Sequence, residues 1–467
     1  MPHQDKDGCS VVYNVEYLKQ ALHWLLGPVD WSSIIFRDDC TWQPLQLGVV
    51  ALLWAWSDEP TLGDRFFAAR RIADQLYRPQ REFATSYQAF GKMLVRWAEK
   101  LVRLVQRALQ QRMQSALPEH WCVFGLILFG VDGSRFDLPR TQSHETAYGV
   151  RRNKRGKKLK RNRRLKPRTA AHTKKANVPQ MWLTLLWHVG TGLPWTWRNG
   201  PTGSSEREHW RAMLPELPEA ALIAADAGFV GYEYLRAVLE SGRSAVLRVG
   251  SNVRLLRKLG WAKETDGTVY LWPDRAAAKR QTPLTLRLVV AQGGKHPVYL
   301  VTNLSQRRLS DTQVIEIYRR RWGIELYFRH LKQTFQRRKL RSTSADLAQV
   351  ELEWSLLGLW GMGLYAQAEQ FKHDIPIKTV SMAGVLRAFR RILRDYLHPV
   401  SPRHSLRALL RQAVRDSYLR KNKTSRDYPR KKQADPPAGP PEIKAATPAQ
   451  VQHARQLHAE LPKGLTA

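Results

Sequence analysis

A segment between Ser310 and Gln336 is the strongest constraint on how this chain can fold. Apolar residues recur in it at helical spacing, which predicts a helix with one side in a core. A second stripe carries one acid among cations, within roughly 60° of arc on an ideal helix. The apolar stripe is Ile317, Ile324, Phe328, Leu331 and Phe335, and the polar stripe is Tyr318, Arg321, Glu325 and Lys332.

The position of Glu325 on that helix admits two interpretations. A single acid held among cations at the edge of a core is typical of a catalytic or metal-binding position. The plainer interpretation is an ion pair within the helix, with Arg321 or Arg329 as the partner. The helix alone does not decide between them.

The charge of the chain predicts a polyanionic partner. Its 467 residues include 76 Lys and Arg but only 40 Asp and Glu, which gives a formal net charge of +36. Such an excess favours nucleic acid. Residues 151–175 hold fourteen Lys or Arg and no acid. We expect them to form a loop that contacts phosphates, although a solubilising or targeting tract is the alternative. The expected DNA contacts there are Arg151, Arg152, Lys154, Arg155, Lys157 and Lys158.

Other classes of protein fit the sequence less well. The longest apolar runs are shorter than the roughly 20 residues that a membrane-spanning helix needs. The first ten residues are polar and do not resemble a signal peptide. Three widely separated cysteines fit neither a disulfide framework nor a zinc site. We therefore expect a soluble intracellular protein without a membrane partner.

Changes in periodicity predict an α/β fold with a mixed central sheet and additional helical regions. Residues 1–118 are expected to be a helical, DNA-binding domain, with a helix-turn-helix and a plain helical bundle equally favoured. The catalytic α/β domain is expected in 119–250 and 298–345, with 151–178 as its basic loop. We expect a β-rich insertion at 251–297, helices that serve dimerisation at 346–418, and a disordered basic, Pro-rich tail at 419–467.

Three acids are candidates for metal-dependent phosphoryl transfer, which needs carboxylates that converge on a pair of divalent cations. Asp132 follows the apolar run at 121–131, and Asp226 follows the run at 221–225. Each is expected to emerge at the end of a strand, and Glu325 adds a third acid. Taken singly, an Asp after a strand is often a turn former or a helix cap. Asp137 and Glu316 are competitors that we rank lower.

The combined pattern resembles the insertion-sequence-four group of bacterial DDE transposases. That group carries a Tyr-(2)-Arg-(3)-Glu-(6)-Lys signature, which Tyr318, Arg321, Glu325 and Lys332 match without a gap. Asp132 in Asp-Gly-Ser and Asp226 in Ala-Asp-Ala-Gly-Phe resemble its two aspartate motifs. The resemblance covers about residues 120–340.

This resemblance implies an RNase H-like catalytic domain that performs cut-and-paste transposition with two Mg²⁺ or Mn²⁺ ions. Asp132, Asp226 and Glu325 would be the catalytic, metal-binding acids. Tyr318, Arg321 and Lys332, with Arg329 beside them, would contact DNA.

The resemblance also implies a route and partners. The route would include end nicking, a hairpin intermediate and strand transfer, carried out by a homodimer on paired inverted repeats and target DNA in the bacterial cytoplasm, at the nucleoid. A hairpin requires an unstacked base, for which Trp272 is a candidate aromatic, although a core role is the plainer interpretation. The alternatives are a nuclease of the same fold without strand transfer, and a catalytically silent DNA-binding regulator.

Overall fold

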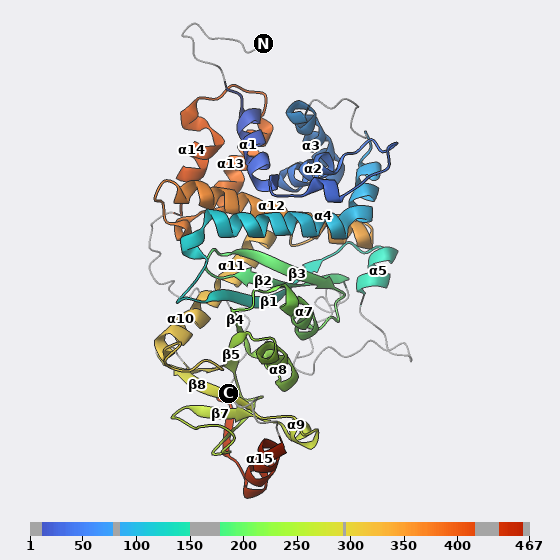
Figure 1. The fold of residues 1–467 in the computed structure, drawn as a ribbon. Helices are drawn as coiled ribbons and strands as arrows, with labels where there is room; N and C mark the ends of the chain where they lie inside the picture. Colours follow the sequence, from blue (N-terminus) through green and yellow to red (C-terminus); the bar gives the residue numbers. More distant parts are fainter. Residues whose placement is uncertain (1–11, 78–84, 150–177, 293–295, 416–438, 461–467) are drawn as a thin grey trace, which may run out of the picture.

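The computed structural model describes residues 12–77, 85–149, 178–292, 296–415 and 439–460. In this part of the chain the strands form one sheet with the order β10-β6-β7-β8-β9-β5-β4-β1-β2-β3. Helices from both ends of the sequence pack beside β3, at one edge of the sheet (Figure 1). The opposite edge carries the insertion and the C-terminal helix.

The five strands next to the helices form an RNase H-like core, as expected. β1 pairs antiparallel with β2 and parallel with β4, and β4 pairs parallel with β5. Helices α7 (Glu206–Met213) and α8 (Tyr232–Glu240) follow β3 and β4. The strands are β1 (Ile127–Asp137), β2 (Gln180–His188), β3 (Leu193–Gly200), β4 (Ala221–Ala225) and β5 (Ser244–Val249).

The expected β-rich insertion extends this core sheet. It pairs through β9 with β5 in antiparallel register, so its hydrogen bonds continue those of the core. It also contains a short helix, α9 (Asp274–Ala278). The strands of this part are β6 (Arg254–Arg257), β7 (Thr268–Leu271), β8 (Leu284–Ala291) and β9 (Val298–Thr302).

The expectation of a wholly disordered C-terminal tail was wrong for residues 439–460. They form β10 (Glu442–Ala445), which pairs parallel with β6, and α15 (Pro448–Glu460). The helix places His453 against the Trp272 ring and His458 against Trp261. The composition of the segment hides this order, because its partners belong to the insertion, more than 150 residues earlier in the chain. The rest of the predicted tail lies outside the described residues.

The N-terminal and C-terminal helices pack together rather than forming two separate regions. α12 (Ala345–Phe371) contacts α2, α4, α13 and α14, and every residue from Val350 to Gln370 is buried. The buried stretch of α12 is therefore core, and α13 and α14 carry the exposed surface of the segment in which we expected a dimer contact. The other helices are α1 (Asn14–Leu26), α2 (Pro44–Trp56), α3 (Leu62–Tyr77), α4 (Tyr87–Ala116), α5 (Gln142–Tyr148), α13 (Met382–Arg394) and α14 (Leu406–Gln412).

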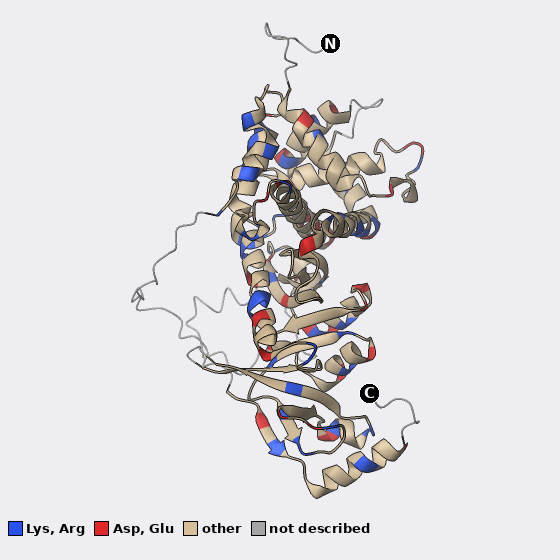
Figure 2. Cartoon of the chain, turned by 60° about the vertical axis from the view of Figure 1, so that its left-hand side comes forward, with Lys and Arg blue, Asp and Glu red and all other residues tan. Residues whose placement is uncertain are grey.

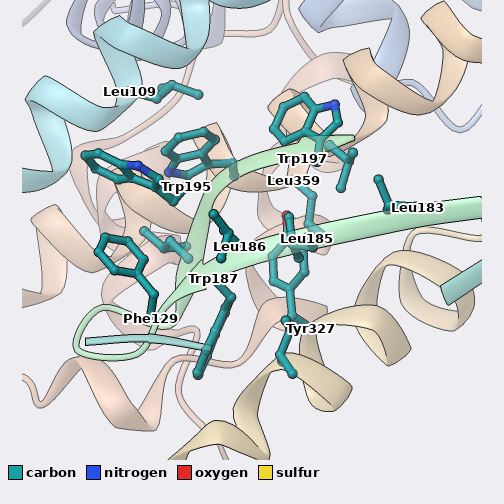
Figure 3. Close-up of a cluster of buried hydrophobic side chains, with 14 of the residues drawn as sticks. Leu109, Phe129, Leu183, Leu185, Leu186, Trp187, Trp195, Trp197, Tyr327 and Leu359 are labelled. Atoms are coloured by element: carbon teal, nitrogen blue, oxygen red, sulfur yellow. The ribbon is translucent and has the colours of Figure 1, made fainter. Parts of the chain in front are cut away.

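Large apolar side chains join the helices to the sheet. Figure 3 shows Leu109 of α4 near Trp195 and Trp197 of β3, and Tyr327 near Trp187 of β2. The side chains of this cluster are buried, which removes a large aromatic area from water. Among the described residues, no helix is long and apolar enough to cross a membrane.

The predicted helix at 310–336 is present, but it is divided into three pieces. α10 (Asp311–Arg321) begins with a capping box in which Ser310 and Gln313 each accept a hydrogen bond from the backbone N–H of the other. α11 (Gly323–Arg329) follows after Trp322, and a π-helical turn covers 330–334. All five residues of the predicted apolar stripe are buried.

Gly323 allows α11 to approach the sheet. A Cβ atom at this position would lie 2.1 Å from a ring carbon of Trp187, which is itself buried. We expect Gly323→Ala to lower the free energy of unfolding by about 1–3 kcal/mol, because the ring or the helix must move. Chemical denaturation measures this loss.

Two further variants test that explanation. Gly203→Ala is the matched control, since no atom lies within 4 Å of a Cβ there. Replacing Trp187 by Leu in the Gly323→Ala background should recover part of the loss. A Gly323→Ala protein as stable as the parent would contradict the close approach.

Glu353 of α12 should make stability depend on pH. Its Oε1 accepts hydrogen bonds from Asn199 and Gln349, both at 3.1 Å, but burial raises its pKa to about 7. The folded state therefore keeps a proton that the unfolded chain releases, so stability falls as pH rises from about 4.5 to about 7. Glu353→Gln should be more stable than the parent at pH 8 by about 1–3 kcal/mol, with no such gain at pH 4.

Denaturant unfolding at the two pH values checks this difference. Glu219→Gln, a change at an exposed position, should follow the parent at both pH values. An equal gain for Glu353→Gln at pH 4 and pH 8 would rule out titration of Glu353 as its source.

Candidate active site

Asp132 lies within β1 rather than after it, which corrects the predicted strand end. The parallel pairing of β1 with β4 ends at Val131 and Ala225, so Asp132 and Asp226 come next on the two strands. β1 continues to Asp137 only because β2 pairs with it on the other side. Asp132 therefore lies just past the end of the pairing with β4, as expected. Its backbone is still held by the pairing with β2.

Asp226 begins a short turn directly after β4 and collects several donors. Its Oδ1 accepts hydrogen bonds from the backbone N–H of Ala227 at 2.8 Å and from the Tyr318 hydroxyl at 3.1 Å. Two guanidinium groups lie farther away, with Arg248 Nη1 at 3.6 Å from Oδ1 and Arg321 Nη2 at 4.0 Å from Oδ2. The second aspartate is therefore tied to α10 by a signature tyrosine and a signature arginine.

Arg321 connects the carboxylates of the site. Its buried guanidinium lies 3.3 Å from Glu325 Oε1 and 4.0 Å from Asp226 Oδ2. The Nε atom of Arg321 is buried and has no hydrogen-bond partner in the described structure. A cation with an unused donor at this position suits a phosphate group that enters beside the acids.

Lys332 joins the π-helical turn to the first aspartate motif. Its Nζ donates a 2.6 Å hydrogen bond to Ser134 Oγ and lies 4.9 Å from the centre of the Phe136 ring. Single π-helical turns are frequent at functional sites. This turn brings Lys332, the fourth signature residue, back to β1. Tyr318 and Arg321 approach Asp226, and Lys332 contacts the motif of Asp132.

Burial and mutual repulsion disfavour the charged forms of two of these acids. The pKa of Asp132 is raised mainly by burial, with a further contribution from the negative charge of Asp226. The pKa of Glu325 is raised by burial first, and the charges of Asp132 and Asp226 add to the effect. Arg321 lowers the pKa of both without cancelling the rise. The set would therefore gain from an added cation.

The donor chemistry of the site fits a divalent metal ion such as Mg²⁺ or Mn²⁺, since carboxylate oxygens are the ligands that these ions prefer. The placement is looser than a formed metal site. Across the described ranges, no three His, Cys, Asp or Glu side chains are gathered closely enough to hold an ion. Arg321 lies between Asp226 and Glu325 instead.

Other expected site residues are not brought to this place. Arg329 is exposed, and no ion pair or hydrogen bond links it to the three acids in the described structure. Trp272 is only 4% exposed, and its Nε1 donates to Gln281 O at 2.7 Å, so its ring has the core role that was the plainer interpretation and is not open to a DNA base. The basic residues from Arg151 to Lys158 lie outside the described residues.

The two competing acids have structural partners. Asp137 accepts a 2.6 Å hydrogen bond from Gln180, and Glu316 forms an ion pair with Arg320 at 2.9 Å. Neither is among the leading causes of the pKa shifts of Asp132 and Glu325. Their lower ranking agrees with these positions.

Sequence reasoning missed one residue beside Asp226 and one exposed residue within the signature segment. Arg248 lies near Asp226. A single arginine in the apolar strand β5 was the signal that could have identified it. Trp322 is 58% exposed between Arg321 and Gly323, whereas most tryptophans of the chain are buried. Its position within the signature could have drawn attention to it, but the periodic pattern assigns it no role.

Comparisons with known proteins identify the family of this chain. Residues 125–360 match the family described as the transposase DDE domain. The transposase InsG for insertion sequence element IS4 of Escherichia coli (strain K12) is 26% identical over 290 residues, which are 60% of this chain and 60% of the relative. The match thus spans about three fifths of that relative's length.

A solved structure of the piggyBac transposase synaptic complex with hairpin DNA covers 90% of this chain and 89% of its own. It is 12% identical with a TM-score of 0.38, which is too low to support an inference. The family match includes β1, β4 and the whole signature segment, and it spans half of the sequence. The chain therefore belongs to the transposase DDE domain family.

Proposed function

We propose that this protein is a transposase that cuts DNA at the ends of a mobile element and joins those ends to target DNA. The observation that supports the proposal is that Arg321 lies within 4.0 Å of Asp226 and of Glu325, beside the end of the β1–β4 pairing that Asp132 follows. These acids come from two adjacent strands and one helix, far apart in sequence. Family membership supports the same activity, and the relative that it matches is named a transposase.

The three acids are the proposed ligands of the divalent ions. Ions bound there would supply a nucleophile at neutral pH and neutralise charge on the reacting phosphate. Strands β1 and β4 hold the two aspartates, while α11 holds Glu325 from the other side. The acids are half-buried, so their electrostatic interactions with the reacting group would be stronger than those of fully exposed side chains.

The signature cations are proposed to hold the DNA backbone at the reacting end. Arg321 has an unused Nε donor, and Lys332 is held by Ser134 beside the first aspartate. Tyr318 keeps its proton, since burial and Asp226 raise its pKa to about 12, so its hydroxyl remains a donor. The exposed indole of Trp322 offers a surface on which an unstacked base can rest, as a hairpin route requires.

Basic surfaces on the helices are proposed to bind the flanking DNA. The exposed face of α4 carries Arg96, Lys100, Arg103 and Arg107. α13 buries its apolar side and exposes Arg387, Arg391 and Arg394. Figure 2 shows Lys and Arg following one another along one edge of the molecule. We further propose that a homodimer pairs two element ends in the bacterial cytoplasm, at the nucleoid.

Asp226→Asn tests the proposed chemistry. The change keeps the size of the side chain and removes a metal-binding charge, so strand-transfer product should fall to background. The assay combines the purified chain, a donor fragment with the inverted repeats that flank its gene, Mg²⁺ and a target plasmid. Binding to the donor fragment, measured by gel shift, should persist because the basic surfaces are intact.

Glu316→Gln is the matched control, because it removes an acid of the same helical segment that lies outside the proposed site. It should retain most of the parent's activity. Cleavage without joining by the parent protein would favour a nuclease of the same fold. DNA binding with neither reaction, in a folded preparation, would favour a catalytically silent regulator.

A further inference from the structure

A fourth carboxylate lies between the two aspartate motifs. Glu206 is the first residue of α7, directly after the N-cap Ser205. A Cβ atom built on Gly133 would lie 2.1 Å from Glu206 Oε1, and one built on Gly228 would lie 3.9 Å from Oε2. Gly133 follows Asp132 in the chain, and Gly228 is two residues after Asp226. The Glu206 carboxylate therefore occupies the space between these two glycines.

The sheet geometry explains how α7 reaches this place. Successive residues of a strand face opposite sides, so Gly130 and Gly133 face different sides of β1. A Cβ at Gly130 would meet Arg321, whereas one at Gly133 would meet Glu206. The parallel neighbour β4 has already ended at Ala225, so the edge of β1 is open beside Asp132. Glu206 thus approaches the aspartates from the face opposite to Arg321.

No partner within the described structure accounts for the inward position of Glu206. Its carboxylate makes no hydrogen bond or ion pair there, although it is partly buried and lies in the field of Asp132. The charge of its neighbour Arg207 lowers the pKa of Glu206, but the Arg207 Nε donates to Gly228 O at 2.8 Å and the guanidinium lies over the Tyr234 ring, so no ion pair with Glu206 forms. A sheltered carboxylate without a partner is costly unless a cation approaches it.

The second acid of the same helical turn behaves differently. Glu208 is exposed, and its Oε1 accepts a 2.7 Å hydrogen bond from the Tyr234 hydroxyl. Acids in the first turn of a helix are common because they interact well with its dipole. The interaction with the helix dipole explains why an acid occurs at position 208. It does not explain why the Glu206 side chain turns toward Gly133.

We propose that Glu206 is a fourth acidic ligand of the divalent-cation site formed by Asp132, Asp226 and Glu325. This assignment rests on the proposed function, because it uses the same cation site. Glycine at position 133 leaves the space that Glu206 fills, so the two residues act together. Arg321 and Glu325 bound the site on one face of β1, and Glu206 bounds it on the other.

Binding of Mn²⁺ to the full chain tests this assignment without relying on activity. Free Mn²⁺ is measured by electron paramagnetic resonance during a titration of the parent and of three variants. Glu206→Gln should weaken Mn²⁺ binding about tenfold or more, an effect of the size seen when groups that support a metal site are lost. Glu208→Gln, the same change two residues later, should leave the affinity within twofold of the parent.

Asp226→Asn separates this inference from the proposed function. If Asp226→Asn weakens Mn²⁺ binding while Glu206→Gln does not, the assignment of Glu206 fails and the three-acid site stands. If neither change matters, both the assignment and the proposed cation site fail. Transposition by the parent is assayed independently, so its absence would overturn the proposed function even if Glu206 binds Mn²⁺.

Gly133→Ala provides a second variant that does not alter any acid. The added methyl group should displace the Glu206 carboxylate and weaken Mn²⁺ binding to a similar extent. The double variant with Glu206→Gln should bind no more weakly than either single variant, because both changes remove the same ligand. Fully additive losses would contradict the proposal, and thermal unfolding confirms that each variant is folded.

Discussion

The parallel pairing of β1 with β4 is the constraint on which the rest of the site depends. Its register ends at Val131 and Ala225, so the next residue on each strand is an aspartate. A slip by one residue would turn one of these side chains to the other face of the sheet. The strands are buried and apolar, which fixes the register strongly. The core of the sheet thus sets the positions of both acids before any helix contributes.

The helical segment contributes a cation, Arg321, as well as the third acid, Glu325. The pKa values of Asp132 and Glu325 are raised first by burial and then by the charges of neighbouring acids, and Arg321 lowers both. With it, the acids are held in reach of each other but are not closed into a metal site. The guanidinium therefore stabilises the set of acids, and in the proposed function the remaining negative charge would bind the metal ions.

The sequence predicted the parts of the site that depend on local patterns. The apolar run at 221–225 located β4, and helical spacing located the signature segment and its buried stripe. The continuation of β1 past Asp132 was not predictable, because it depends on pairing with β2 across a long connection. The inward position of Glu206 was hidden for a similar reason. Its cause is an absent side chain at Gly133, a residue of another strand.

The contact between the insertion and the C-terminal segment was also not predictable from local sequence patterns, because the two segments lie far apart in the chain. Neither Trp261 nor Trp272 signals its role by itself, and the tail that covers them is polar and rich in proline. Together they bury Trp272, partly cover Trp261, place a histidine against each ring and add a parallel strand to the sheet. The tryptophan left open to solvent is Trp322, within the signature itself. Burial in the fold, rather than residue type, therefore decides which aromatic ring is available to DNA.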